Sequence, residues 1–163
     1  ARVWTQDAAA PLAAPPGGLR GVSFGGGAPL PEAPALALAG AARGGIRVAV
    51  SDFLFPHDPD ALVRRLGRGV ARLALVQVLS RAERDPPASG RVRLEDVETL
   101  SRRDLVAGPA EREGYRARLR RLREGLREAA RAARGLFLDA DEAEPLAAIL
   151  RRWAGEGLVE PCG

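Results

Sequence analysis

Apolar and polar positions along this chain repeat with two different periods, and the order of these periods predicts the fold. Ile46, Val48 and Val50 form a short β-branched run that is typical of a buried strand. Residues 73–79 are almost wholly apolar, as in a strand that is buried on both faces. Residues 58–70, between the two runs, begin with aspartate and proline and continue with apolar residues at helical spacing. A strand, a helix and a strand in this order predict a parallel βαβ unit.

Two more helices and a third strand are predicted after this unit. Residues 109–134 give the strongest helical pattern of the chain, with Arg and Glu surrounding one apolar stripe. The stripe consists of Tyr115, Leu119, Leu122, Leu126 and Ala130. Gly125 lies inside this helix, where glycine costs about 1 kcal/mol relative to alanine. Residues 136–138 predict a brief strand, and residues 146–155 predict the last helix.

The remaining segments predict loops, one further helix and a hairpin. Residues 1–5 alternate weakly and are a strand candidate, while residues 29–43 are rich in Ala and Leu and predict a helix. Residues 80–90 predict a polar loop. Residues 91–94 and 104–107 predict the two strands of an exposed hairpin.

Composition changes this picture little. The 163 residues are enough for one domain with a real core, and 46% of them are apolar. Only 4% are aromatic, so aliphatic packing must form most of that core. All 25 basic residues are arginine, and the net charge of +4 is a small excess over interleaved acidic residues. Such interleaving favours a solvated mixed surface over a basic face that binds nucleic acid.

Cysteine usage and hydropathy indicate the compartment. Cys162 is the only cysteine, which excludes a disulfide framework and a multi-cysteine zinc site. No apolar run approaches the roughly 20 residues of a membrane span, and the first residues lack the pattern of a signal peptide. We therefore expect a soluble protein in a reducing, cytoplasmic compartment.

Asp52 is the best single candidate for chemistry. It follows Ser51 at the end of the first predicted strand, and open α/β sheets place their ligand sites at strand ends of this kind. A carboxylate there can bind a hard divalent cation. It can also cap the following loop, and one carboxylate without further ligands favours this structural role.

Other polar residues favour structural roles as well. His57 is the only histidine and lies near Ser51 and Asp58, but no G-x-S-x-G motif accompanies them and a catalytic triad depends on geometry rather than on sequence neighbours. We therefore expect a loop histidine without a catalytic role. An acidic cluster lacks the spacing of a calcium loop, and capping of the last helix explains it, with the second and last members in a capping-box spacing. The cluster consists of Asp139, Asp141, Glu142 and Glu144, and the capping-box pair is Asp141 and Glu144.

The arginine-rich face of residues 109–134 has two interpretations. It could contact phosphates, which would make the chain a basic nucleic-acid-binding module. Four glutamates lie on the same helix, however, and neither a helix-turn-helix pattern nor an aromatic stacking platform accompanies it. A solvated amphipathic surface that faces a protein partner is the favoured interpretation.

A family resemblance extends over about residues 45–155, carried by several short motifs in a fixed order. These are Ser51-Asp52-Phe53-Leu54, Gln77-Val78-Leu79, Glu83, Pro87, Gly90-Arg91-Val92-Arg93-Leu94, Asp96-Val97-Glu98-Thr99, Tyr115-Arg116-Ala117-Arg118-Leu119 and Glu144-Pro145-Leu146. In this order and spacing the chain resembles bacterial domain-of-unknown-function family 58, whose members carry a von Willebrand factor A-like domain. The resemblance implies a doubly wound, Rossmann-like, mostly parallel sheet with helices on both faces, here with a small hairpin insertion.

The resemblance also implies a metal site, which this sequence matches in part. Von Willebrand A domains bind Mg²⁺ through an Asp-x-Ser-x-Ser motif after the first strand, a later Thr and an Asp at a strand end. Asp52 matches the last of these, whereas the first motif does not occur in the chain. We therefore expect residues 1–163 to be a single domain of this type that lacks the first strand and its metal motif. Magnesium would bind weakly, and only if the missing part completed the site.

The implied function is an interaction rather than a reaction. Family members are commonly encoded beside MoxR-type AAA+ ATPases, and a chaperone-like or assembly role is the usual proposal. We expect a non-enzymatic domain that binds a protein partner, such as an AAA+ ATPase of this type. The partner would contact the strand end through Ser51, Asp52, Phe53 and His57. The alternatives are the nucleic-acid-binding module described above and a metal-dependent hydrolase, against which the missing ligands argue.

Overall fold

The structure is a computed structural model, and it describes residues 2–3, 12–13, 44–86, 90–95 and 102–157. The chain divides into two units, which are described separately. They are Ala1–Ala42 with Val92–Leu105, and Arg43–Arg91 with Val106–Gly163. The second unit contains the parallel sheet and all four of the candidate interaction residues.

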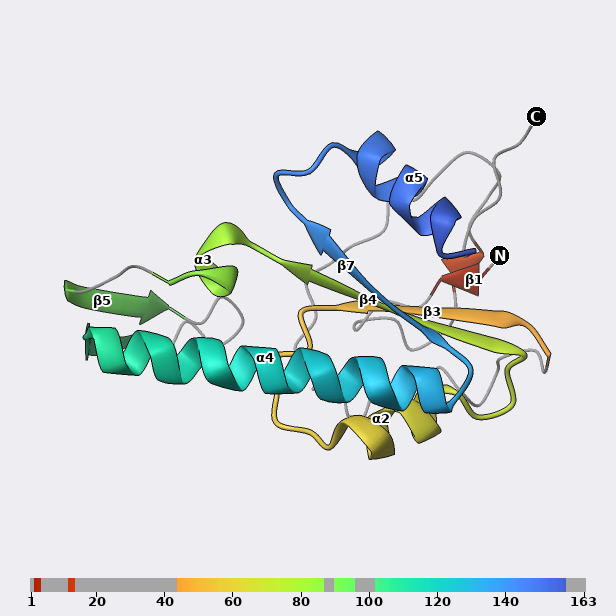
Figure 1. Ribbon diagram of the computed structural model, residues 1–163, viewed down its shortest axis with the longest axis horizontal. Helices are drawn as coiled ribbons and strands as arrows, with labels where there is room; N and C mark the ends of the chain where they lie inside the picture. Colours follow the sequence, from red (N-terminus) through yellow and green to blue (C-terminus); the bar gives the residue numbers. More distant parts are fainter. Residues whose placement is uncertain (1, 4–11, 14–43, 87–89, 96–101, 158–163) are drawn as a thin grey trace. The chain divides into compact units, whose positions relative to one another are not determined.

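Three parallel strands form the sheet of the second unit. They are β3 (Ile46–Ser51), β4 (Arg72–Leu79) and β7 (Leu136–Asp141), in the spatial order β3-β4-β7 (Figure 1). The register places Ala49 beside Leu75, and Leu75 beside Phe137. The predicted α/β class with a mostly parallel, Rossmann-like sheet is therefore confirmed. Strand β7 is longer than its predicted apolar part, because its last three residues alternate Asp-Ala-Asp.

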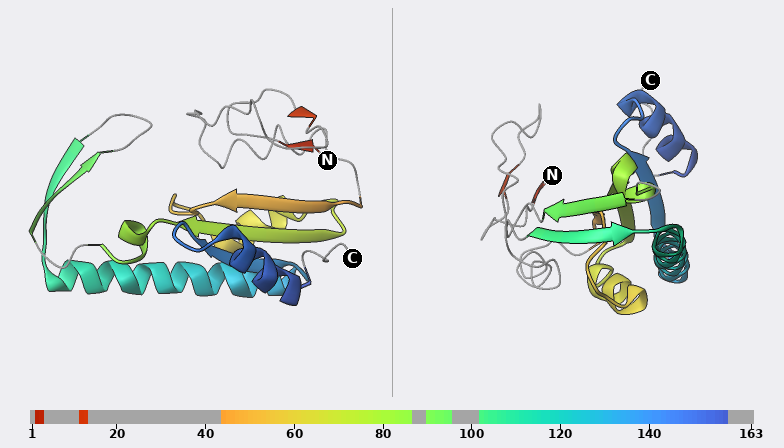
Figure 2. Two further views of the ribbon diagram at one scale, coloured as in Figure 1. Left: turned by 90° about the horizontal axis from the view of Figure 1, so that it is seen from above. Right: turned by 90° about the vertical axis from the view of Figure 1, so that its left-hand side faces the viewer.

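Helices lie on both sides of this sheet. Helices α2 (Pro59–Leu66) and α4 (Pro109–Ala132) pack against each other on one side, and α5 (Leu146–Gly155) lies on the other side (Figures 1 and 2). The sequence determines where α2 begins, because the Asp58 carboxylate accepts a hydrogen bond from the Ala61 amide at 2.7 Å and Pro59 occupies the first turn. Within the described ranges, no helix combines the length and the apolarity that crossing a membrane requires.

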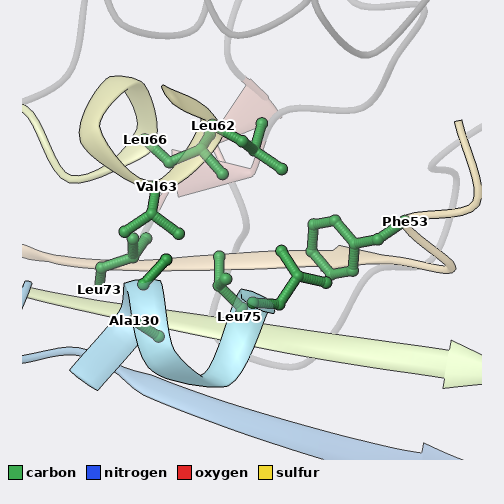
Figure 3. Close-up of a cluster of buried hydrophobic side chains, with 9 residues drawn as sticks. Phe53, Leu62, Val63, Leu66, Leu73, Leu75 and Ala130 are labelled. Atoms are coloured by element: carbon green, nitrogen blue, oxygen red, sulfur yellow. The ribbon is translucent and has the colours of Figure 1, made fainter. Parts of the chain in front are cut away.

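The core lies between the sheet and the α2–α4 pair. The side chains of Leu73 and Leu75 point from β4 into this layer, where both are at most 2% exposed. Burial of a leucine side chain contributes about 1.5–3 kcal/mol relative to exposure. Figure 3 shows this cluster of buried side chains from β4, α2, α4 and the turn after β3. Its members are Phe53, Leu62, Val63, Leu66, Leu73, Leu75, Leu126, Ala129 and Ala130.

Strand β4 is buried on its second face as well. Ala74 and Val76 alternate with the core leucines and are at most 1% exposed. Leu138 of the neighbouring strand lies beside Val76 on this face, and Ile149 of α5 is also buried. The prediction of a strand buried on both faces is confirmed for residues 73–77.

The prediction that β3 is a buried strand is wrong for the face on which its three β-branched residues lie. Ile46, Val48 and Val50 are 64%, 48% and 62% exposed. Strand β3 lies at the edge of the described sheet, and no described element covers the face opposite α2 and α4. Only the alternate residues face inward, such as Ala49, which packs against the core. A β-branched run indicates a strand, but it does not say which face of that strand is covered.

Two glycines allow close packing that a larger residue would prevent. A Cβ at Gly125 would lie 3.1 Å from Cγ of Pro59, so the glycine that weakens α4 lets α2 approach it. A Cβ at Gly135 would lie only 2.7 Å from the Leu73 carbonyl oxygen, where β7 begins beside β4. Helix propensity at Gly125 is therefore lost in exchange for helix–helix contact.

Two local features differ from the sequence-based expectation: the segment after β4 and the start of α5. A short helix, α3 (Arg81–Arg84), occupies the predicted polar loop, with a capping box between Ser80 and Glu83. The capping box predicted for Asp141 and Glu144 does not form, since α5 begins after Pro145 without a side-chain cap. The Asp141 carboxylate instead accepts a hydrogen bond from the Ala143 amide at 2.9 Å.

The two strands of the predicted hairpin insertion pair with each other. They are β5 (Gly90–Glu95) and β6 (Arg102–Ala107), and an ion pair of 2.8 Å joins Arg93 and Asp104 across them. In the first unit, β1 (Arg2–Val3) pairs antiparallel with β2 (Leu12–Ala13). The predicted helix over residues 29–43 and Cys162 lie outside the described residues.

Replacement of a core side chain tests this assignment of faces. Leu75→Ala should lower the free energy of unfolding by about 2–5 kcal/mol, because it leaves a cavity between β4 and the two helices. Urea denaturation followed by far-UV circular dichroism measures the change. Val48→Ala is the matched control on the uncovered face of β3 and should cost less than about 1 kcal/mol. Equal losses for the two variants would contradict the assignment.

Candidate interaction site at the carboxyl end of the sheet

The carboxyl ends of the three strands bring three polar side chains into one row. The register places Ser51 beside Gln77, and Gln77 beside Asp139. These positions share the face that packs on α2 and α4, because they continue the alternation of Leu73 and Leu75. The row marks the end of the sheet at which the sequence placed the candidate site.

The turn after β3 holds the Asp52 carboxylate in a fixed position. The Ser51 hydroxyl accepts a hydrogen bond from the Phe53 amide at 3.0 Å, and Asp52 Oδ1 accepts one from the Leu54 amide at 3.0 Å. Phe53 adopts a φ of 56°, which is unfavourable for a bulky residue. Its ring is fully buried in the core cluster, and this burial offsets the backbone cost. Asp52 itself is exposed, so a buried neighbour anchors an accessible carboxylate.

Gln77 fixes the same turn from the central strand. Its side chain is 0% exposed, and its Nε2 donates a hydrogen bond of 2.7 Å to the backbone carbonyl of Asp52. The carbonyl only accepts hydrogen bonds, so the amide nitrogen must face Asp52. The Gln77 Oε1 is buried and has no hydrogen-bond partner among the residues that the structure describes. Sequence reasoning missed this residue, although a single amide within an otherwise apolar strand is a usable signal.

His57 has a structural role in the loop between β3 and α2. Its Nδ1 donates a hydrogen bond to the Phe55 carbonyl at 2.7 Å, and its ring centroid lies 4.5 Å from that of Phe55. Ser51 bonds within its own turn, and Asp58 caps α2. The three residues that suggested a triad are thus engaged separately.

Tyr115 connects α4 to this end of the sheet. Its hydroxyl donates a hydrogen bond to the Glu83 carbonyl at 2.6 Å. Burial raises the pKa of Tyr115, and the negative charges of Glu83 and Asp52 raise the pKa further. The apolar stripe predicted the position of Tyr115 on α4 but not its polar contact.

The acidic cluster at the end of β7 and in the turn after it forms ion pairs in addition to hydrogen bonds with the backbone. Asp139 accepts a hydrogen bond from Arg123 at 2.8 Å, and Asp141 lies 3.5 Å from Arg84. Arg152 of α5 donates to Glu144 at 3.0 Å. These pairs tie α3, α4 and α5 to the end of β7, so the cluster is a structural junction.

The described residues do not complete a magnesium site at Asp52. No group of three or more His, Cys, Asp or Glu in the described ranges could hold a metal ion. The Ser51 hydroxyl lies 3.4 Å from Asp52 Oδ1, and the Asp52 backbone carbonyl already accepts a hydrogen bond from Gln77. Mg²⁺ needs near-octahedral oxygen ligation, which this set alone does not supply.

The arginines of α4 are mostly paired within the protein. Arg112 and Arg116 both donate to Asp85, at 2.7 and 2.6 Å, and these bonds hold the pKa of Asp85 below its ordinary value. Arg120 pairs with Glu113 at 2.9 Å, and Arg127 lies 5.4 Å above the Phe137 ring. Five of the eight arginines of this helix thus have a carboxylate or aromatic partner among the described residues, which favours the interpretation as a mixed, solvated surface.

A charge at Gln77 tests its role as the anchor of the turn. Gln77→Glu should destabilise the protein at pH 7 by about 2–4 kcal/mol, because burial disfavours the ionised carboxylate and raises its pKa. Because the pKa of the introduced glutamate is raised in the folded state, the loss of stability should be small below about pH 4, where the protonated acid can donate to the Asp52 carbonyl. The loss should be complete at neutral pH, where the carboxylate is ionised in the unfolded chain. Urea denaturation at pH 4 and pH 7, each relative to the unsubstituted protein, measures it. Gln77→Met should lose about 1–2 kcal/mol at both pH values, and a Gln77→Glu loss that does not change with pH would contradict this account.

Comparison with known proteins places the chain in a family. The model of the family described as protein of unknown function DUF58 matches residues 26–125 of the 163. This match includes β3, β4, the hairpin and the first two-thirds of α4. The comparison with curated proteins and the comparison with solved structures each found no significant match. The chain therefore belongs to the DUF58 family, whose members are proteins of unknown function.

Proposed function

We propose that this domain is a non-enzymatic protein-interaction module that binds its partner at the carboxyl end of the sheet, around Asp52. The observation that carries the proposal is the accessible Asp52 carboxylate on a turn that is held by Ser51, by Gln77 and by the buried Phe53 ring. A charged group that is already ordered loses little conformational entropy when it binds, so it can contribute to both affinity and specificity.

The surroundings of Asp52 suit a protein surface. Leu54 is 38% exposed although it is apolar, and Pro56 beside it is exposed as well. A carboxylate next to exposed apolar groups is matched by a basic side chain next to an apolar patch on the partner.

Interaction is favoured over catalysis by the way in which the polar groups are used. Ser51, His57 and Asp58 each hydrogen-bond to the backbone of their own loop, and among the described residues no hydrogen bond joins any two of the three side chains. A nucleophile needs a neighbouring base within hydrogen-bond reach, and these three residues do not supply that pair.

The class of partner follows from the family resemblance. Members of this family are commonly encoded beside MoxR-type AAA+ ATPases, so we propose such an ATPase as the partner and protein assembly or maturation as the process. Asp52 would then contact a basic group of the ATPase, either directly or through a Mg²⁺ ion that the partner helps to coordinate.

Binding to the host's own MoxR-type ATPase tests the proposal. The immobilised ATPase should bind the domain, and Asp52→Ala should weaken the affinity at least about tenfold, which corresponds to about 1.4 kcal/mol. Surface plasmon resonance, with and without Mg²⁺, measures it. If removal of Mg²⁺ and the Asp52→Ala substitution weaken binding to the same extent, the carboxylate binds a shared metal ion. If removal of Mg²⁺ leaves the affinity unchanged while Asp52→Ala weakens it, the carboxylate contacts the ATPase directly.

Asp60→Ala is the matched control for this experiment. Asp60 is an exposed carboxylate in the first turn of α2, a few residues from the site, and its replacement should leave the affinity unchanged. An Asp52→Ala variant that binds as well as the Asp60→Ala variant would refute the proposed surface. Failure of the unsubstituted domain to bind would exclude this ATPase as the partner.

A further inference from the structure

Arginines at the two ends of the sheet have different surroundings. At the carboxyl end and along α4, arginines pair with carboxylates, as Arg84, Arg116 and Arg123 do. The opposite end contains the end of α2, the start of β4 and the end of α4. No ion pair with a described carboxylate involves the arginines of α2 and the connection to β4. These are Arg64, Arg65, Arg68 and Arg72.

Three of these arginines line one cavity, and of the three Arg72 also donates a hydrogen bond of 2.9 Å to the Gly157 carbonyl. Arg64, Arg68 and Arg72 line a space of about 160 Å³, and no carboxylate of the described residues lines it. Its remaining lining is apolar and includes Val63 and Leu73. The volume corresponds to roughly five water molecules at about 30 Å³ each, which is enough for one small anionic group.

Helix polarity accounts for only part of this arrangement. The carboxyl end of a helix attracts cations, and arginines in the last turn of α2 gain about 0.3–1 kcal/mol each in this way. The carbonyls of this end already have another cation, since the Arg47 guanidinium donates to the carbonyls of Leu66 and Arg68. Arg64 and Arg68 are both exposed, with their guanidinium groups left for another acceptor.

We propose that this cavity binds a phosphate group that is attached to a small organic body. Guanidinium groups match phosphate oxygens with two parallel hydrogen bonds, which makes arginine the preferred residue for such sites. A phosphomonoester carries a charge close to −2 at neutral pH and therefore suits three arginines better than a single carboxylate does. The apolar lining accommodates the attached organic group.

This site is independent of the surface proposed around Asp52. The two lie at opposite ends of the strands, because Arg72 begins β4 and Gln77, which holds Asp52, lies near its end. A failure of one proposal therefore leaves the other untouched. The phosphate could come from a soluble phosphomonoester or from the head group of phosphatidic acid, which present the same chemistry.

Phenyl phosphate is a suitable probe, because it combines the dianion with an apolar ring. Isothermal titration calorimetry should show that the domain binds phenyl phosphate more tightly than inorganic phosphate. Arg68→Gln should weaken this binding at least tenfold. Arg65→Gln is the matched control, since Arg65 is an exposed neighbour on α2 that does not line the cavity, and it should change the affinity less than twofold. Thermal melts of both variants confirm that they remain folded.

A vesicle experiment separates the two sources of phosphate. If the domain co-sediments with phosphatidic acid vesicles in a manner that depends on Arg68, and binds them more tightly than phenyl phosphate, the site binds the phosphate of a lipid head group. Binding of phenyl phosphate without vesicle binding supports it with a soluble ligand. The proposal is overturned if neither probe binds, or if Arg65→Gln and Arg68→Gln weaken binding equally.

Discussion

The burial of strand β4 on both faces is the constraint on which the rest of this unit depends. Its leucines form the floor of the core under α2 and α4, while Ala74 and Val76 are buried on the side of α5. Among the described residues, both other strands of the sheet pair with β4 alone. Gln77 is the one buried polar residue of this strand, and it connects the strand to the turn that carries Asp52. The candidate site therefore takes its rigidity from the best packed element of the fold.

The elements that the sequence predicted well are those whose signal is local and complete. Strand β4 has a two-sided apolar run, and α4 repeats one stripe from Tyr115 to Ala130, over about four turns, so neither depends on what surrounds it. The prediction for β3 failed because burial of Ile46, Val48 and Val50 depends on a cover that lies elsewhere in space. Asp52 could be found from its place after a strand. Its hydrogen bond with Gln77 could not, because the two residues are 25 positions apart in the sequence and nothing local indicates which side chain will reach the turn.

Electrostatics divides the unit into two ends with different properties. At the carboxyl end, acidic and basic groups neutralise one another in pairs such as Arg123 with Asp139, and Asp52 is left as an accessible carboxylate. At the amino end, Arg64, Arg68 and Arg72 line a cavity whose other lining residues are mostly apolar, and no described carboxylate lines it. The small net charge of the chain is thus compatible with two local surfaces of opposite charge, and each suits a different kind of ligand. Membership in a family of unknown function leaves both surfaces to be assigned by experiment.

The central claim is that the turn carrying Asp52 is as well ordered as β4. Native-state hydrogen exchange tests it most directly, because the amides of Phe53 and Leu54 donate to the side chains of Ser51 and Asp52. We predict that these two amides exchange within about tenfold of the slowest amides of β4, since opening the turn would also expose the buried Phe53 ring. If both amides exchange as fast as those of exposed loop residues while β4 stays protected, the turn is mobile and the claim is wrong.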